Sequence, residues 1–362
     1  MRNSVKFIGS LMMLLIVVTT LKAQEGWEPQ KRITGYISSE VDVFSELEGY
    51  DNSYGLSLSE AGILASYQPK ENLVFKAVFV YRPDFSFNQM LNEANVQYKV
   101  SDLVNFKVGR FLTPLSPMNT YYYAPVNTSA TLPMLISNHE FFPLNMDALS
   151  IAGRTGFNFK LSYEAFVGGY RNTTWMRTGA VGFFGDEVAY YKKKLNSEYT
   201  IDESFNNSSN VAVGGNVHLS YKDYVTVGVN VFKPRNENMA IFVPAYNLTR
   251  KLKKELVAYG VDFKLSLNNT SVIGEVWNTD FSMNGTSVDL NGAFVQLSQE
   301  IGKVTPFVRY EDQTTNDISF KRYTGGMMFK PTFETTVKLE YLHYDHKVEN
   351  VDGAVLSLIY SF

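Results

Sequence analysis

The sequence predicts an all-β protein, a transmembrane antiparallel β-barrel of about sixteen strands. Apolar and polar residues alternate along stretches of about ten residues, the length of a tilted strand that crosses a bilayer. Short and long connectors alternate between these stretches. The chain also ends on an alternating segment, Gly353 to Phe362, whose apolar face continues to a terminal aromatic residue.

The N-terminal residues have the layout of a secretory signal peptide. Arg2 and Lys6 precede an apolar run from Phe7 to Val18, and a small residue follows shortly afterwards. This order of a positive, an apolar and a small-residue segment is typical of such peptides, and the run is too short for a membrane anchor. We therefore predict a signal peptide at residues 1–23, followed by a single barrel domain at residues 24–362.

Composition narrows the classes of function. Charged residues make up 19% of the chain and aromatic residues 14%, mostly Tyr and Phe, which suit a surface between lipid and water. The chain contains no cysteine, which excludes disulfides, thiolate metal sites and attachment of lipid to cysteine. The formal net charge of −3 argues against nucleic acid as a partner, because nucleic-acid-binding proteins carry basic patches. We expect no cofactor and no metal.

Strict alternation predicts the membrane strands. Side chains of a strand point to alternate faces, so each stretch has one apolar face and one face of charges, amides and glycines. Strands of a soluble β-sandwich would be shorter, about 5 or 6 residues. No run after the signal peptide approaches the roughly 18 apolar residues of a spanning helix, which leaves a closed barrel as the membrane structure. The clearest stretches lie at residues 94–100, 159–167, 211–221, 225–231 and 257–267.

Connector lengths predict the topology. Short connectors lie at residues 68–72, 100–103, 153–157, 221–224, 267–270, 301–304 and 330–333. Long connectors lie between them, near residues 46–55, 83–90, 112–146, 171–208, 234–253, 280–289, 312–318 and 345–350. This alternation implies an even number of strands with both chain ends on one side. Since outer-membrane barrels have short periplasmic turns and long external loops, we predict that both termini are periplasmic.

The inward faces of the predicted strands carry charges of both signs. A barrel of about sixteen strands is wide enough to hold water, so these charges would line a lumen. Bases slightly outnumber acids, which leaves a neutralised, hydrated wall and a weak preference for anions as open interpretations. The bases selected as pore-lining or constriction candidates are Lys76, Arg82, Lys107, Arg110, Arg154, Lys160, Lys264, Arg309 and Arg322. Other inward charges are Lys99, Lys338, Glu60, Glu93, Glu164, Asp262, Glu275, Glu311 and Glu340.

The connector at residues 112–146 differs from the other long connectors. It contains many prolines and aromatic residues and almost no charge. Because a long loop in water is usually polar, this one is expected to pack against another surface. We predict that it folds into the barrel after the fifth strand and narrows the lumen, with Asn138, His139 and Glu140 as solute contacts. The alternative is a loop that covers the barrel or a subunit contact.

Three features resemble Gram-negative outer-membrane porins. The position of the 112–146 connector is similar to that of the inward-folded third loop of general porins. Gly109 to Ser116 resembles the loop entry of the phosphate-selective porin O and P type, although the dense Arg and Lys ladder of that type is missing here. The final strand, Ala354 to Phe362, resembles the C-terminal aromatic signature that the barrel assembly machinery recognises.

This resemblance implies a water-filled channel in the cell outer membrane. Small hydrophilic solutes would diffuse through it passively, outer-membrane lipid would surround it, and a homotrimer is among the expected assemblies. Two alternatives remain open: a substrate-selective channel for phosphate or other anions, and a non-conducting barrel that binds partners through its external loops.

An enzyme is not expected. His218 and Ser220 lie two residues apart, as in outer-membrane lipid hydrolases. In the predicted register both face the lumen, whereas the lipid substrate would lie outside the barrel.

Overall fold

The described strands form one antiparallel barrel. The computed structural model describes residues 27–45, 53–83, 90–120, 123–137, 141–170, 200–201, 210–235, 237–243, 248–283, 285–315, 318–346 and 350–362. The predicted signal peptide lies outside this part of the chain, so its cleavage stays a prediction. Within these ranges, no helix combines the length and the apolar character needed to span a membrane.

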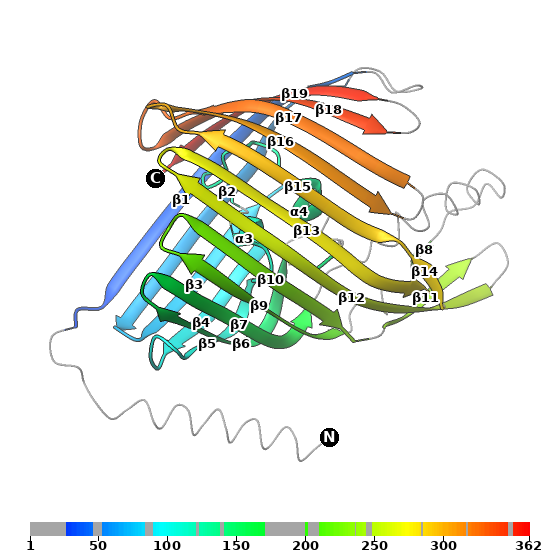
Figure 1. Ribbon diagram of the computed structural model, residues 1–362, viewed down its shortest axis with the longest axis horizontal. Helices are drawn as coiled ribbons and strands as arrows, with labels where there is room; N and C mark the ends of the chain where they lie inside the picture. The colour runs from blue at the N-terminus through cyan, green and yellow to red at the C-terminus, as the bar shows by residue number, and fades with distance from the viewer. Residues whose placement is uncertain are drawn as a thin grey trace, which may run out of the picture.

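Sixteen long strands follow one another around the barrel. They are β1 (Gln30–Phe44), β2 (Ser53–Lys70), β3 (Leu73–Tyr81), β4 (Leu91–Lys99), β5 (Asn105–Leu112), β6 (Asn145–Gly156), β7 (Phe159–Tyr170), β9 (Asn210–Tyr221), β10 (Val225–Pro234), β12 (Leu248–Leu267), β13 (Thr270–Met283), β15 (Leu290–Gln299), β16 (Val304–Thr315), β17 (Ile318–Phe329), β18 (Thr335–His346) and β19 (Val351–Ser361). Each pairs with the next, and β19 pairs with β1 (Figure 1). The predicted fold class and strand number are therefore confirmed.

Three shorter strands extend the sheet beyond the barrel wall. β8 (Thr200–Ile201) pairs with β11 (Glu237–Val243), β11 pairs with β12, and β14 (Thr286–Val288) pairs with β13. All three lie at the end of the barrel with the long connectors.

Closure of the barrel brings the two ends of the chain together. Phe362 N donates to Gly35 O at 2.9 Å, and Gly35 N donates to Phe362 O at 2.8 Å. Ser361 N also donates to Glu334 O at 2.7 Å, in the tight turn between β17 and β18. Both chain ends of the barrel therefore lie at the end that carries the tight turns. We call this the short-turn end and the opposite one the long-loop end.

The two faces of the strands differ as the alternation predicted. On β19, Leu356, Leu358 and Tyr360 are exposed on the outside, whereas Ser357 between them is buried. On β12, Val261 is exposed and the neighbouring Asp262 is buried. The exposed face is apolar and the hidden face is polar, the reverse of a protein that folds in water.

One predicted connector is displaced. The sequence placed a turn at residues 153–157, but β6 continues to Gly156 and the turn lies beyond it. Gly156 has φ +99°, a backbone conformation that residues with a side chain rarely adopt, and it ends the strand. Gly153 instead makes room for a neighbour, because a Cβ there would lie 2.6 Å from the hydroxyl of Tyr163. That hydroxyl donates to Leu103 O at 2.6 Å.

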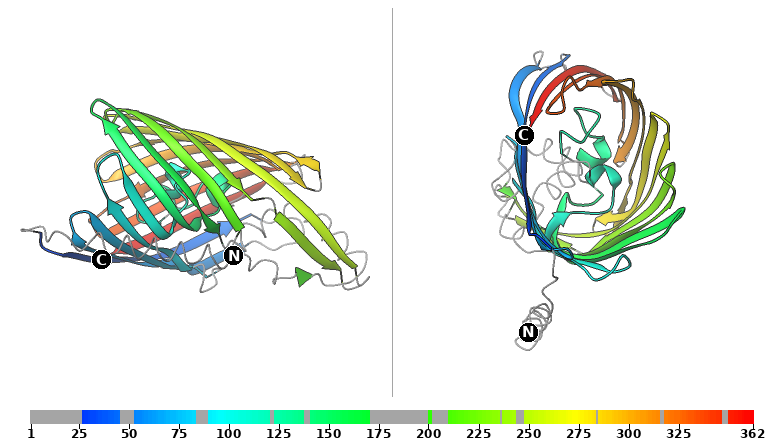
Figure 2. Two further views of the ribbon diagram at one scale, coloured as in Figure 1. Left: turned by 90° about the horizontal axis from the view of Figure 1, so that it is seen from below. Right: turned by 90° about the vertical axis from the view of Figure 1, so that its left-hand side faces the viewer.

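Much of the buried core lies inside the barrel. The connector between β5 and β6 enters the lumen and carries two short helices, α3 (Pro117–Thr120) and α4 (Met134–Ser137), as the end-on view in Figure 2 shows. Its residues Leu115, Ile136 and Phe141 have no exposed surface. Phe142 packs on Trp277 of β13, with ring centroids 4.8 Å apart. The predicted inward fold of this connector is confirmed.

Candidate pore constriction

The inserted loop, residues 113–144, is closed at its neck by its own backbone. Thr113 N donates to Leu144 O at 2.9 Å, which brings its two ends together. The buried amide of Asn119 donates to Thr113 O at 2.8 Å and to Leu144 O at 3.1 Å. The described residues of the loop carry no charge. Because it is largely shielded from water, its polar backbone groups need partners on the barrel wall.

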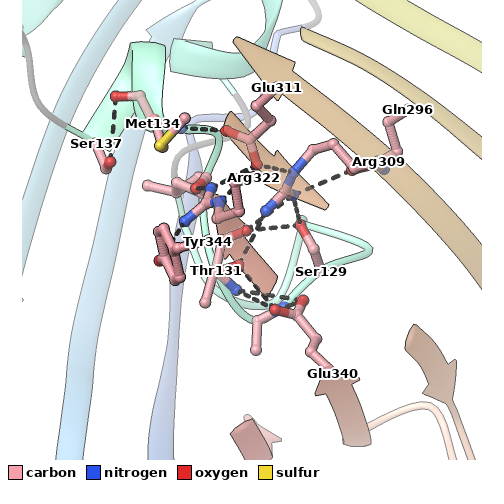
Figure 3. A network of polar contacts seen from close by, with 12 residues as sticks. Ser129, Thr131, Met134, Ser137, Gln296, Arg309, Glu311, Arg322, Glu340 and Tyr344 are labelled. Atoms are coloured by element: carbon pink, nitrogen blue, oxygen red, sulfur yellow. Dashed lines mark hydrogen bonds and ion pairs between the residues drawn. The ribbon is translucent and has the colours of Figure 1, made fainter. Parts of the chain in front are cut away.

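Strands β16 and β17 supply the densest group of these partners (Figure 3). Glu311 Oε1 accepts from Arg309 Nε and from Arg322 Nε, each at 2.7 Å. The second oxygen of Glu311 accepts from Met134 N, at the start of α4, at 2.6 Å. The side chains of the three charged residues are at most 5% exposed. Such a hidden cluster is stable only when its hydrogen-bonding groups have partners, and all three charged groups have them here.

Both arginines also donate to the inserted loop. Arg309 Nη1 donates to Ser129 Oγ at 2.8 Å and to Thr131 O at 3.1 Å, and its Nη2 donates to Thr131 Oγ1 at 2.9 Å. Arg322 donates to Leu132 O, and to the hydroxyl of Tyr344 at 3.0 Å. Arg309 and Arg322 therefore hold the loop in place. Neither presents its charge to open water.

Strand β18 binds the preceding part of the loop with one base and one acid. Lys338 Nζ donates to Ala124 O at 2.7 Å and to Ser129 O at 2.9 Å. Glu340 accepts from Ala130 N, from Thr131 N at 3.1 Å and from Thr131 Oγ1 at 2.8 Å. The wall thus provides donors to the loop carbonyls and acceptors to its amides.

Other wall acids bind the loop on further sides of the barrel. Glu275 of β13 accepts from Ser116 Oγ at 2.6 Å and from Met118 N at 3.3 Å. Glu93 of β4 accepts from the hydroxyl of Tyr123 at 2.9 Å. Burial, followed by the charge of Glu93, raises the pKa of the Tyr123 phenol far above its ordinary value. The inserted loop therefore crosses the barrel and is attached to several walls.

Three further predicted bases are neutralised by wall acids. Each forms a short ion pair with a carboxylate on a neighbouring inward position, and the acids also hydrogen-bond to hydroxyl or amide groups. These pairs are Lys76 Nζ with Glu93 Oε1 at 2.8 Å, Arg82 Nε with Glu60 Oε2 at 2.6 Å, and Lys107 Nζ with Glu164 Oε1 at 2.8 Å.

Three more of the selected bases line two cavities at the short-turn end. Arg154 and Lys160 line the first, about 860 Å³, which we call the β6–β7 cavity. Lys264 lines the second, about 580 Å³, between β12, β13, β15 and the inserted loop, which we call the β12–β15 cavity. Within the described ranges, Arg154 and Lys264 have no ion-pair partner, and Lys160 reaches only the exposed Asp223 at 3.4 Å. These three bases remain in contact with water.

The structure places Arg110 elsewhere than predicted. On β5, Phe106 and Val108 are exposed on the outer face, and Arg110 continues that face. Its guanidinium pairs with Asp147, the adjacent outward position on β6, with N–O distances of 2.7 and 3.0 Å. The assignment of Arg110 to the lumen was therefore wrong, because Arg110 pairs in register with Asp147, which lies on the outward face of β6.

The remaining candidates are of two kinds. Asn138, His139 and Glu140 lie outside the described residues, so their predicted role as solute contacts stays a prediction. His218 and Ser220 face inward as expected, and they bind different partners. His218 Nε2 lies 3.1 Å from Asp262 Oδ2, whereas Ser220 Oγ lies 2.9 Å from Thr226 Oγ1. Among the residues that the structure describes, no group of three or more His, Asp or Glu side chains is arranged to hold a metal ion.

Comparison with known proteins gives matches in fold. No family model and no curated protein sequence matches this chain. A loop-deletion mutant of OmpT from Vibrio cholerae matches with a TM-score of 0.63 and 11% identity, over 92% of this chain and 99% of that one. The anion-selective porin from Comamonas acidovorans matches with a TM-score of 0.60 and 12% identity, over 92% and 100%.

A third structure extends the comparison. OmpF from Salmonella typhi, in complex with daunomycin, matches with a TM-score of 0.57 and 12% identity, over 92% of this chain and 97% of that one. The chain has a porin fold. At these identities the likeness concerns the fold alone. None of the three supports the finer resemblance of Gly109 to Ser116 to the phosphate-selective type.

Proposed function

We propose that this protein is an outer-membrane porin through which small hydrophilic solutes diffuse passively. The observation that carries the proposal is a closed barrel with an apolar outer face and with water-accessible, charge-lined cavities beside an inserted loop. An apolar exterior fits lipid, and a polar interior of this width fits an aqueous path. Flow would follow the solute gradient, with no cofactor and no chemical step.

In this proposal the inserted loop is a fixed constriction. Its contacts with Glu311, Glu340 and Lys338 join its backbone to the wall, so it narrows the lumen without moving during each passage. Size exclusion then depends on the space left between the loop and the walls that it does not cover. Asn138, His139 and Glu140 remain proposed solute contacts.

A weak preference for anions is a second, finer proposal. Arg154 and Lys160 are in contact with water in the β6–β7 cavity, where the acids Asp102 and Glu164 are paired with Lys99 and Lys107. Away from this cavity, the acids Glu275 and Glu311 are buried and hydrogen-bonded. Exposed charges determine the field that a diffusing ion meets, and paired buried charges contribute little to it. The scattered arrangement of these bases favours a weak preference over a dedicated phosphate site.

Location and assembly follow from the same proposal. The short-turn end, with both chain ends, would face the periplasm, and the long-loop end would face outward. The strand from Ala354 to Phe362 would be the segment that the barrel assembly machinery recognises. A homotrimer is the expected assembly, in line with the trimer form named for one similar solved structure, OmpT of Vibrio cholerae.

Reconstitution of the mature chain tests the function. Proteoliposomes should swell in isotonic glucose, and planar bilayers should show stepwise ion conductance. In a salt gradient, a reversal potential displaced toward that of chloride would support the anion preference. Folded protein that gives neither swelling nor conductance would contradict the channel and favour a barrel that binds partners through its external loops.

A further inference from the structure

The β12–β15 cavity differs from the β6–β7 cavity in its chemistry. Most of its polar lining is uncharged, with hydroxyl or amide groups from Thr226, Ser266, Gln296, Ser298 and Thr305 on the wall and from Asn127 on the inserted loop. Its two inner acids are already engaged. Asp262 accepts from Asn230 Nδ2 at 2.7 Å, and Glu275 accepts from Ser116 and Trp277. The charged groups left for a ligand are Lys264 and Glu300.

Hydrogen-bonding groups of both kinds are unmatched on this lining. Gln296 is 3% exposed; its Oε1 accepts from Arg309 Nη1 at 3.2 Å, and its Nε2 has no hydrogen-bond partner among the described residues. Thr305 is 9% exposed, and its hydroxyl, which can accept as well as donate, has no partner in the same part of the chain. An unmatched donor and an unmatched acceptor suit a group that both accepts and donates, and the hydroxyl group is the simplest of these.

Apolar side chains complete the lining. Phe294 of β15 and Met118 of α3 are both almost fully buried, and both line the cavity. A site that combines apolar surface with dispersed hydroxyl and amide groups matches a sugar ring, which has apolar C–H faces and a rim of hydroxyl groups. The volume, about 580 Å³, lies within the roughly 300–1,000 Å³ range of small-molecule sites.

We propose that the β12–β15 cavity is a binding subsite for a neutral saccharide of one or two rings. This inference deepens the proposed porin function, since it names a class of solute for one of the two cavities. A neutral solute would bind between the inserted loop and β15 and β16. Gln296, Thr305 and Ser298 would bind its hydroxyl groups, while Arg309 keeps Gln296 in position. Anions would be attracted instead to the β6–β7 cavity.

Sucrose binding to the mature protein in detergent micelles tests the inference without requiring conduction. Saturation-transfer NMR should detect sucrose bound to the wild-type protein. The dissociation constant for sucrose should rise about fivefold in Thr305→Val and in Ser298→Ala, the loss expected for one neutral hydrogen bond. Thr324→Val is the matched control for Thr305→Val. Thr324 is another buried, inward threonine whose hydroxyl has no partner in the described residues, and it lines neither cavity. Its affinity for sucrose should equal that of the wild type.

Failure of this inference can be told apart from failure of the porin function. Protein that conducts ions but gives no saturation transfer to sucrose would overturn the saccharide subsite and leave the channel intact. Equal sucrose affinity in wild type, Thr305→Val and Ser298→Ala would also overturn it. Protein that binds sucrose with the expected loss in both variants, but does not conduct, would retain the subsite and remove the channel.

Discussion

Arg309 and Arg154 both lie on the inward face of a barrel strand, yet their surroundings are opposite. The side chain of Arg309 is fully buried and donates to Glu311 and to the inserted loop. Arg154 is exposed in the β6–β7 cavity and has no ion-pair partner among the residues described. The inserted loop causes the difference, because it excludes water from one wall and leaves the other hydrated. An inward charge can therefore belong either to the structure or to the path of a solute.

Removal of a charged side chain should therefore change the free energy of unfolding by different amounts in the two regions. Removing one member of a buried ionic cluster leaves its partners charged in a dry environment, which is strongly destabilising. Removing a hydrated charge leaves nothing unmatched, so stability changes little while the local field changes. Variants in the two walls should therefore separate into those that alter stability and those that alter selectivity.

Glu311→Ala should have the largest effect. It leaves Arg309 and Arg322 without their shared carboxylate and Met134 N without its acceptor, so we expect a loss of about 3–5 kcal/mol in the free energy of unfolding. Urea-induced unfolding in phospholipid vesicles measures this loss. Released from β16, the loop should also give larger current fluctuations in planar bilayers.

Glu300→Ala is the matched control for that variant. Glu300 is an exposed acid of the β12–β15 cavity, and we expect its removal to change stability by no more than about 0.5 kcal/mol. If Glu311→Ala and Glu300→Ala unfold at the same urea concentration, the distinction between the two walls is incorrect.

Phe142→Ala should have the next largest effect on stability. The ring of Phe142 is 1% exposed and packs on Trp277, so its removal leaves a cavity between the loop and β13, at a cost of about 3 kcal/mol. Phe333→Ala is the control, since that ring is 97% exposed at the short-turn end. Thermal unfolding followed by heat-dependent gel mobility compares the two, and an equal transition temperature would show that the inserted loop is not packed on this wall.

Arg154→Glu should change selectivity and leave stability almost unchanged. Reversing a hydrated charge in the β6–β7 cavity changes the field that an entering ion meets, so the reversal potential in a salt gradient should move toward the cation side. The stability change should stay within about 0.5 kcal/mol. An unchanged reversal potential in a conducting variant would remove this cavity from the ion path.

Lys264→Gln should give the smallest effect. The reversal potential should again move toward the cation side, by less than in Arg154→Glu. Lys264→Gln removes one charge where Arg154→Glu reverses one, and Glu300 lines the same cavity. Reversal potentials of the two variants, measured at about 0.1 M and 1 M salt, compare the cavities directly, since screening should reduce both shifts at the higher concentration. A shift larger than that of Arg154→Glu would contradict the proposal that the β6–β7 cavity has the greater influence on ion selectivity.

Local pattern predicted the barrel because its signal repeats in every strand. Leu356, Leu358 and Tyr360 face outward for the same reason that Tyr259 and Val261 do: side chains alternate, and the outward apolar face of a membrane barrel meets lipid. The same alternation, applied to β5, corrects the predicted face of Arg110. Lys107 and Arg110 are an odd number of positions apart, and Asp147, the residue paired with Arg110, faces outward.

Composition predicted the inserted loop but not its contacts. A segment that is rich in proline and aromatic residues and almost without charge is unfavourable in water, so its burial followed from sequence. The sequence did not predict that Ser129 and Thr131 accept hydrogen bonds from Arg309, because nothing in it distinguishes them from other hydroxyl residues. Their role depends on Arg309, which lies about 180 positions along the chain. The contact of Gln296 with Arg309 was not predicted for the same reason.

By itself, the sequence determined the barrel, its strand number, the location of both chain ends at the short-turn end and the identity of the segment that leaves the wall. These properties depend on alternation and composition, which act over a few residues. Only the tertiary structure decided which inward charged groups are buried and which stay in contact with water. That distinction depends on where one loop lies against walls that are distant in sequence, and on the water it displaces.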